Sequence, residues 1–361
     1  MRRSWLVAEL GAALDYVYSD RSRMLALLAL ADGDLIDALA GRRRRELHER
    51  YAHFSCDRAA DAGVASSICR HGRSFPAALR RRRDAPHALY IEGRADRFTE
   101  LTQGAVVAVV GSAHASDYGR AVARGLGRGL AASGVAVAAS LCDGVCAAAL
   151  AGAAEVHGPA ICVTPGGLAL AGGARRRRLA ESVTRFGCAL SELPCGTPAR
   201  RWGQPAGERI VAAIAQVTVV VEARDTPREL ASALMAQAFG RVVAAVPGRV
   251  TSPMSTGAHA LLAAEAKLVR GAADVLELLG CEGSAGATAR HEPFGGAPDG
   301  LPLQHRQLLE RVGAGEDTPG RLTTGAADSA GVLLALSELE ARGFLGRGDN
   351  GRYVVLAAGE A

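Results

Sequence analysis

Residues 105–132 read AVVAVVGSAHASDYGRAVARGLGRGLAA and contain the two kinds of pattern that decide the fold. Val106 to Val110 is an uninterrupted apolar run that ends at Gly111-Ser112, which indicates a strand buried on both faces. From Gly119 to Ala132 apolar residues recur at helical spacing instead. This stretch therefore predicts a strand, a glycine turn and a helix.

The same alternation continues along the chain to about residue 246. Further apolar runs predict strands at 135–139, 160–163, 189–190, 217–221 and 242–246, and the segments between them predict helices at 176–185, 209–215 and 229–239. Strands that are apolar throughout are buried on both faces. We therefore expect an α/β fold, a Rossmann-like parallel sheet with helices on both sides.

The chain on either side of this sheet has other patterns. Up to about Tyr51 the spacing is helical, residues 281–300 are rich in Gly, Ala and Pro without periodicity, and the tail suggests three helices and a hairpin around Asp349-Asn350-Gly351. Three short helices followed by a hairpin are typical of a winged helix. The predicted parts are a SAM-like helical unit at 1–66, the Rossmann-like domain at 67–280, a linker at 281–300 and a winged-helix-like domain at 301–361.

The composition is that of a globular protein with two or three domains. The 361 residues carry a formal net charge of +5, and 49% are hydrophobic but only 4% aromatic, so Ala, Val and Leu build the core. Of the 42 basic residues only Lys267 is a lysine. Arginine favours forked recognition of phosphate or carboxylate, although the base composition of a genome explains the same bias.

The sequence lacks the usual signals for export, membrane insertion and metal binding. Glu9 and Asp15 interrupt the apolar stretch that a secretory signal requires, and the most apolar window, 135–154, is dominated by Ala, Gly and Cys. The eight cysteines are scattered and form no pair of C-x-x-C motifs. We therefore expect a cytoplasmic protein with no metal, no other cofactor and no contact with a membrane.

Glycine-containing turns follow four of the predicted strands. In a parallel sheet such turns share the carboxyl edge, where free backbone N–H groups bind phosphate. Glycine lets the backbone approach the phosphate, and Ser112 adds a hydroxyl donor. The four turns are Gly111-Ser112, Gly144, Pro165-Gly166-Gly167 and Pro247-Gly248. Together they predict a ligand that carries phosphate.

Motifs of common nucleotide enzymes do not occur. No G-x-G-x-x-G follows a strand and no G-x-x-x-x-G-K-[ST] is present, which argues against a dinucleotide oxidoreductase and a P-loop ATPase. Gly125, Gly127 and Gly129 lie inside a predicted helix and indicate close packing of that helix against the sheet. Glu192 and Glu222 end strands without a histidine at a suitable spacing, so no catalytic residue is predicted.

Three runs of four arginines stand out, at 42–45, 80–83 and 175–178. Four consecutive side chains point all round a helix, so solvation explains such runs better than a ligand does. The run at 175–178 is the exception, because it follows the third glycine turn. It can extend the phosphate site into a basic track that suits the backbone of a single-stranded nucleic acid. Arg200-Arg201-Trp202 places cations beside a tryptophan that either stacks on a base or covers the core.

Four segments resemble the DNA-processing protein A family (DprA, also called Smf). They are VAVVGSAHASDYG from Val107, LSELPCGTP from Leu190, VVVEA from Val219 and GRVVAAVPG from Gly240. The order of the parts is similar over nearly the whole chain. The resemblance implies a non-enzymatic protein that binds single-stranded DNA without sequence preference and loads the recombinase RecA onto it during natural transformation.

The resemblance also implies two sets of contact residues, one for DNA at the carboxyl edge and one for a homodimer through residues 254–268. The DNA-binding set is Gly111, Ser112, Tyr118, Gly119, Gly144, Gly166, Gly167, Arg175, Arg176, Arg201, Arg209 and Gly248. The dimer set is Leu261, Leu262 and Leu268.

Several pocket positions depart from the family pattern. Ala113 stands where the family has an arginine, Asp143 is an acid where the family has a base, and Gly207 replaces a further arginine. The Ser-Gly before the next helix is Pro227-Arg228. Each missing hydrogen bond to phosphate costs roughly 1.5 to 3 kcal/mol, so binding weakens by orders of magnitude unless neighbouring arginines compensate.

Two other functions stay open. Nucleotide or phosphoribosyl hydrolases of the LOG type share the fold and a turn like Pro165-Gly166-Gly167, but they continue with Gly-Thr-x-x-Glu, whereas Leu168-Ala169-Leu170-Ala171 follows here. The missing glutamate argues against this enzyme. The other alternative is a scaffold that has lost DNA binding and keeps its tail as a docking module.

Overall fold

The structure is a computed structural model that describes residues 2–17, 20–54, 66–93, 95–168, 173–280, 301–313, 318–323, 328–342, 344–347 and 353–355. The chain divides into two compact units, Met1–Gly283 and Ser284–Ala361. The linker expected at 281–300 and the turn expected at 349–351 lie outside the described residues.

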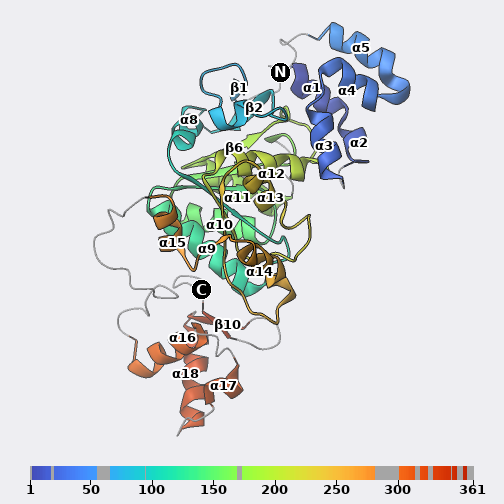
Figure 1. Ribbon diagram of the computed structural model, residues 1–361. Coiled ribbons are helices and arrows are strands. Elements are labelled where there is room, and N and C mark those ends of the chain that lie inside the picture. The colour runs from blue at the N-terminus through green and yellow to red at the C-terminus, as the bar shows by residue number, and fades with distance from the viewer. Residues whose placement is uncertain are drawn as a thin grey trace. The chain divides into compact units, whose positions relative to one another are not determined.

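The first unit is built on a nine-stranded sheet with the order β1-β2-β6-β5-β4-β3-β7-β8-β9 (Figure 1). From β6 to β9 all neighbouring strands are parallel. These strands are β3 (Val106–Val110), β4 (Ala136–Ser140), β5 (Ala160–Val163), β6 (Cys188–Ser191), β7 (Val217–Val220), β8 (Val242–Ala245) and β9 (Lys267–Leu268). Every residue of β3 to β7 is buried, which confirms that the apolar runs are strands covered on both faces.

Two antiparallel strands extend one side of the sheet, which the expectation of a purely parallel sheet missed. β1 (Ser66–Cys69) pairs with β2 (Ala88–Glu92), and β2 pairs with β6, both in antiparallel register. After two reversals, β1 runs in the same direction as β6. The loop between β1 and β2 therefore begins and ends at the edge where β6 ends. An apolar run such as 88–91 carries no sign of its direction, so the sequence could not show this.

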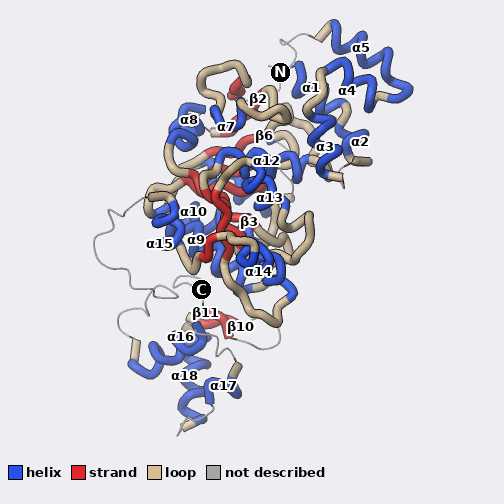
Figure 2. The backbone as a smooth tube through the Cα atoms, viewed as in Figure 1, coloured by secondary structure: helices blue, strands red, loops and turns tan. Residues whose placement is uncertain are grey.

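Helices cover both faces of the sheet (Figure 2). One face packs against α9 (Asp117–Ala132), α10 (Val145–Glu155), α11 (Ala174–Thr184) and α15 (Ala272–Leu278). The other packs against α7 (Ala77–Arg80), α8 (Ala95–Gln103), α12 (Gly203–Ile214), α13 (Ala231–Ala238) and α14 (Thr256–Ala263). Residues of β3 alternate between the two cores: Val107 and Val109 face α9 and α10, while Val106 and Ala108 face α12 and α13.

Close backbone approaches explain two glycines of α9. A Cβ atom at Gly127 would overlap the carbonyl of Ala149 in α10, and one at Gly129 would lie 2.7 Å from Cβ of Ala272 in α15. The expectation that these glycines pack the helix against the sheet is therefore wrong, because they pack it against other helices. Around Gly125 the structure leaves open space.

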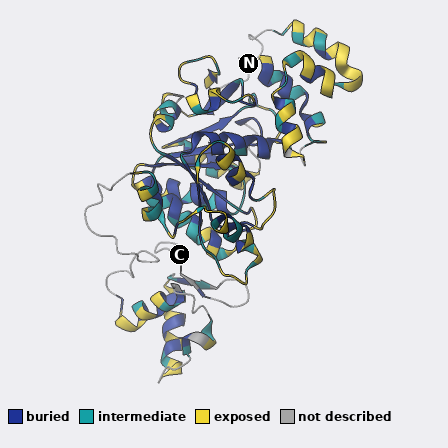
Figure 3. Ribbon diagram, viewed as in Figure 1, coloured by how far each residue is buried: buried dark blue, intermediate teal, exposed yellow. Residues whose placement is uncertain are grey.

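The N-terminal segment forms the expected helices: α1 (Arg2–Glu9), α2 (Gly11–Leu14), α3 (Arg21–Leu28), α4 (Asp32–Leu39), a 3-10 turn (Gly41–Arg43) and α5 (Arg44–Ala52). Leu6, Leu10 and Leu14 lie in a core that also contains Leu193 and Trp202. The helices therefore pack against the end of β6 and the start of α12. Figure 3 shows that their outer faces are exposed, in contrast to the buried sheet.

The second unit contains α16 (Leu303–Gly313), α17 (Pro319–Thr323), α18 (Ser329–Ala341) and an antiparallel pair, β10 (Leu345–Arg347) and β11 (Tyr353–Val355). Its core includes Leu308, Leu336 and Tyr353. These elements match the expected three helices and hairpin, and the winged-helix assignment stays a prediction. Among the helices described in either unit, none is both long and apolar enough to cross a membrane.

Candidate nucleic-acid interface

The turns after β3, β4, β5, β7 and β8 lie at one edge of the sheet because these strands are parallel. The connections run from β3 towards β6 on one side and from β7 towards β9 on the other, so the topology reverses between β3 and β7. Ligands of open α/β sheets bind at such a switch point. We call this region, with the turns beside it, the carboxyl edge.

Backbone hydrogen bonds lock the turn after β3 to its neighbours. Ser112 N donates to Glu222 O at 2.6 Å, and Val145 N donates to Ser112 O at 3.1 Å. The Ser112 residue is only 1% exposed, and its Oγ accepts a hydrogen bond from His114 N at 3.1 Å. The expectation that Ser112 offers a hydroxyl to phosphate is wrong, because this side chain lies below the surface and shapes the turn.

A buried carboxylate, Glu222, anchors the start of α9. Its two oxygens accept hydrogen bonds from Ser116 N at 2.9 Å and from Ser116 Oγ at 2.7 Å, and Ser116 in turn caps the helix by accepting from Gly119 N. The position suits a negative charge, since helix N-termini are partly positive. A Cβ at Gly119 would overlap this carboxylate, so Gly119 is needed for packing, and its N–H is already bonded to Ser116.

Asp143 and Arg176 form an ion pair between the turn after β4 and the first turn of α11. Arg176 Nη2 donates to Asp143 Oδ2 at 2.6 Å, and both side chains are partly exposed. This hydrogen bond is the main cause that lowers the pKa of Asp143, and the charges of Arg175 and His114 act in the same direction. Asp143 does not cap the helix that follows it, because α10 begins after Gly144 without a side-chain cap.

Gly111 and Gly144 keep their backbones close to neighbouring turns. Gly144 has φ +70°, and a Cβ there would overlap Ser112 O, while a Cβ at Gly111 would overlap Glu222 O. Gly111 and Gly144 are both partly exposed. The two glycines therefore bring three turns together at the switch point.

The third glycine turn is filled by the protein itself. Gly166 and Gly167 are buried, and Gly167 N donates to Thr197 O at 2.8 Å. A Cβ at Gly166 would lie 2.6 Å from Ala199 N. The loop after β6 therefore occupies the place that the sequence suggests for phosphate, and the assignment of Gly166 and Gly167 to DNA is wrong.

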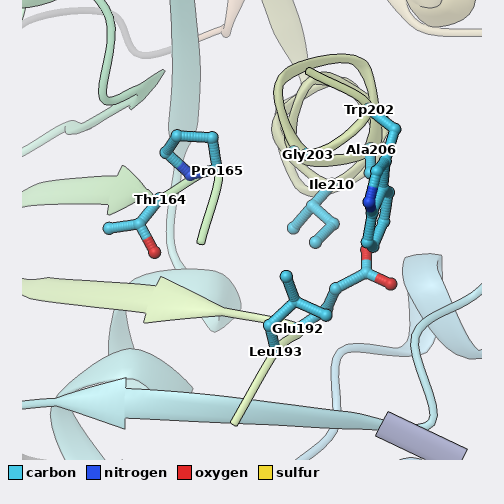
Figure 4. A pocket seen from close by; sticks show the side chains of 9 residues that line it. Thr164, Pro165, Glu192, Leu193, Trp202, Gly203, Ala206 and Ile210 are labelled. Atoms are coloured by element: carbon cyan, nitrogen blue, oxygen red, sulfur yellow. The ribbon is translucent and has the colours of Figure 1, made fainter. Parts of the chain in front are cut away.

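A small cavity lies behind this turn. Figure 4 shows Thr164 and Pro165 on one side, Glu192 and Leu193 on another, and Trp202 lying along α12. The Trp202 side chain is fully buried, and Nε1 has no hydrogen-bond partner within the part of the chain that the structure describes. Base stacking on Trp202 is therefore excluded, and the interpretation as a core residue is confirmed.

Arg209 is also buried and cannot reach DNA, contrary to the expectation. It is 2% exposed, its Nη1 lies 2.5 Å from Glu192 Oε2, and its Nε donates to Asp84 O at 3.0 Å. These interactions tie the middle of α12 to the end of β6 and to the loop before β2. The signal was present in the sequence: the residues three and four positions from Arg209 in α12, Pro205, Ala206, Ala212 and Ala213, are all apolar, which marks a buried helix face.

Exposed groups remain on both sides of the switch point. Tyr118, in the first turn of α9, is 44% exposed. Partial burial and the charge of Glu222 raise its pKa, while Arg249 from the turn after β8 opposes this shift. Arg175 is exposed beside Arg176, and Arg201 is exposed near the start of α12. The Gly248 carbonyl lies 3.1 Å from His259 Nε2. A Cβ atom added at Gly248 would overlap Ser255 Oγ.

The residues expected at a dimer surface differ in exposure. Leu261 is 4% exposed and belongs to the core between the sheet and α14, so its assignment to an interface is wrong. Leu262 packs partly against the same core. Leu268, on the outermost strand β9, is 55% exposed.

The carboxyl edge thus combines a tyrosine, several arginines and one acid held by an arginine. No group of three or more His, Cys, Asp or Glu side chains in the described residues is arranged to hold a metal ion. Such a surface can bind phosphates through guanidinium groups and stack a base or sugar on an exposed ring.

Comparison with known proteins agrees with this geometry. The family model for DNA recombination-mediator protein A matches residues 66–280. A protein of Mycobacterium tuberculosis described as a DNA processing protein DprA is 37% identical over 278 residues, which are 76% of this chain and 70% of that protein. The solved DprA structure from Streptococcus pneumoniae shares 28% identity and a TM-score of 0.60, covering 69% of this chain and 86% of that one.

A second solved structure, DprA from Helicobacter pylori, is 22% identical with a TM-score of 0.53, covers 60% of this chain and 97% of that one, and supports the fold. The family model spans the sheet with both sets of covering helices, from β1 to the end of α15. With the family match and the relative at 37% identity, the chain belongs to the DNA recombination-mediator protein A family.

Proposed function

We propose that this protein binds single-stranded DNA at the carboxyl edge, without preference for base sequence, and delivers it to the RecA recombinase. The observation that carries the proposal is the ion pair of Arg176 with Asp143 beside the exposed Arg175. Through this pair, an arginine from α11 reaches the turn where the family arginine is missing. Arg176 thereby places a guanidinium at this turn, where phosphate can bind it in exchange for Asp143.

The relatives support this assignment. The H. pylori DprA structure was described for its single-stranded DNA-binding mode, and that protein shares this fold. Backbone N–H groups and guanidinium groups contact phosphates and sugars, which carry no base identity. The proposal includes that the protein is not an enzyme, acts in the cytoplasm and forms a homodimer through residues 254–268.

A binding titration tests the proposal. Labelled oligo-dT, a mixed-sequence single strand and a duplex of equal length are compared at low and moderate salt. We expect similar affinity for both single strands, weaker binding to the duplex and a steep salt dependence. Preference for the duplex would contradict a single-strand site and direct attention to the C-terminal unit.

RecA delivery needs a separate experiment. RecA filament formation is followed on single strands that are covered by a single-strand-binding protein. We expect the unmodified protein to speed up RecA assembly, and the Arg176→Ala variant to lose this effect together with DNA affinity. Normal DNA binding without any effect on RecA would limit the function to binding.

A further inference from the structure

The loop between β1 and β2, residues 70–87, is strongly cationic. It contains six arginines, at 70, 73, 80, 81, 82 and 83, and one acid, Asp84. Three of these arginines hold the loop together. Arg70 Nη2 donates to the carbonyls of Arg80 and Arg82 at 3.1 and 2.6 Å, and Arg80 Nη2 donates to Phe75 O at 3.0 Å. Arg82 pairs with Asp84 at 2.9 Å.

The other three, Arg73, Arg81 and Arg83, point to solvent. Within the described ranges of the chain, no carboxylate forms an ion pair with any of them. The loop itself is well anchored: Leu79 and Phe75 are buried in the core with α12, and the Arg82 guanidinium lies 3.4 Å from the ring centroid of Phe239. An anchored loop therefore presents three exposed cations that form no ion pair with the described carboxylates, since Asp84 pairs with Arg82.

The arginine run at 42–45 offers a direct comparison. There, Arg43 pairs with Glu9 and Glu46, Arg44 pairs with Asp37, and Arg45 pairs with Glu49. Two runs that are equivalent in sequence thus differ in structure. Among the described residues, three of the four arginines of the first run form ion pairs, whereas in the second run only Arg82 does.

The chemistry of the loop surface favours a phosphate backbone over a protein. Its apolar residues Phe75 and Leu79 are 2% and 0% exposed, so the surface lacks the aromatic or aliphatic anchors on which protein interfaces depend. Guanidinium groups match phosphate in a forked geometry. We propose that Arg73, Arg81 and Arg83 form a second binding surface for the backbone of single-stranded DNA, and this inference rests on the proposed function.

This second surface lies at the same edge of the sheet as the switch point, but further along it. β2 stands three strands from β4 in the sheet order, which is roughly 14 Å at the usual strand spacing. Six nucleotides of one strand span roughly 20 Å even when they are stacked as in B-DNA. One strand can therefore contact both surfaces, and the second contact adds affinity through effective concentration.

The test compares two triple variants with the unmodified protein. Arg73→Ala/Arg81→Ala/Arg83→Ala removes the proposed second surface, and Arg43→Ala/Arg44→Ala/Arg45→Ala removes the same formal charge from the ion-paired arginines of the other run. Each protein is titrated at low and moderate salt with oligo-dT of about 30 nucleotides, which is longer than a typical single-strand site. Melting temperatures verify that all three proteins are folded.

We expect the loop variant to lose about 2 units of salt slope, at about 0.7 per neutralised phosphate, so that its loss of affinity is largest at low salt. The control should match the unmodified protein at every salt concentration. If the loop variant and the control have equal salt slopes, the inference of a second surface is overturned, while the proposed function is unaffected. Absence of binding by the unmodified protein would overturn the proposed function as well.

Discussion

Asp143 Oδ2 lies 2.6 Å from Arg176 Nη2, so the acid that departs from the family pattern is held by an arginine from the run that follows the third glycine turn. The carboxylate therefore occupies a guanidinium that a phosphate would otherwise bind. We infer that Asp143 and DNA compete for Arg176, and that this competition limits affinity.

Replacing Asp143 releases this arginine. Asp143→Asn should tighten single-strand binding, and Asp143→Arg should tighten it by about tenfold or more at low salt, because it also adds a charge-assisted donor. Since Asp143 does not cap α10, the melting temperature should stay within about 1–2 °C of the unmodified value. The control is Asp117→Asn, which removes an acid from the nearby Asp117–Arg120 pair.

A double variant separates competition from long-range charge. If Asp143 acts through Arg176, then Asp143→Asn should have no effect in an Arg176→Ala background. An equal gain in both backgrounds would show that only the overall charge matters. The competition should be constant at neutral pH, because the hydrogen bond from Arg176 lowers the pKa of Asp143 and the carboxylate releases Arg176 only when the pH falls through that lowered pKa.

The arginine run at 175–178 should account for part of the salt dependence. With all four changed to Ala, the slope of log affinity against log salt should flatten by about 0.7 for each phosphate that the variant no longer neutralises. Arg176 faces Asp143 and Arg175 is exposed beside it, so we expect the variant to neutralise one or two phosphates fewer. An unchanged slope would mean that these four arginines are solvated and do not contact phosphates of the DNA.

Tyr118 is the exposed aromatic ring closest to the switch point. Tyr118→Ala should weaken single-strand binding by about 1–3 kcal/mol, which is the usual loss for one stacked base. Tyr16→Ala serves as the control, since that ring is 89% exposed but lies among the N-terminal helices. Tyr118→Phe should bind normally if stacking, not the hydroxyl, makes the contact. Equal affinities for Tyr118→Ala and Tyr16→Ala would remove Tyr118 from the site.

Trp202 gives an optical test of the buried position. The chain has two tryptophans, Trp5 and Trp202, so Trp5→Phe leaves one reporter. Because the Trp202 side chain is fully buried, its emission should be blue-shifted and should not be quenched when oligo-dT saturates the protein. Quenching that follows the binding curve would mean that α12 opens to DNA.

The sequence was sufficient for the central strands and the most periodic helices, but not for β1, α8 or α10, nor for long-range pairing. Strands such as Val106–Val110 are predictable because burial on both faces demands an apolar run. The Asp143–Arg176 pair joins residues 33 positions apart, and the loop that fills the Gly166 turn has no periodic pattern. Local patterns carry no information on such pairings. Likewise, two identical arginine runs become distinguishable only when their acidic neighbours are placed.

The last prediction concerns association. Leu261 belongs to the core, and Leu262 packs partly against it, so a charge at either position would unfold the monomer before it tested an interface. Leu268 is 55% exposed on the outermost strand, whose free edge can pair with a second copy. Leu268→Glu should therefore yield folded monomers by light scattering. Leu234→Glu, at an exposed leucine of α13, should leave the dimer intact. Dimers that persist in Leu268→Glu would exclude β9 from the interface.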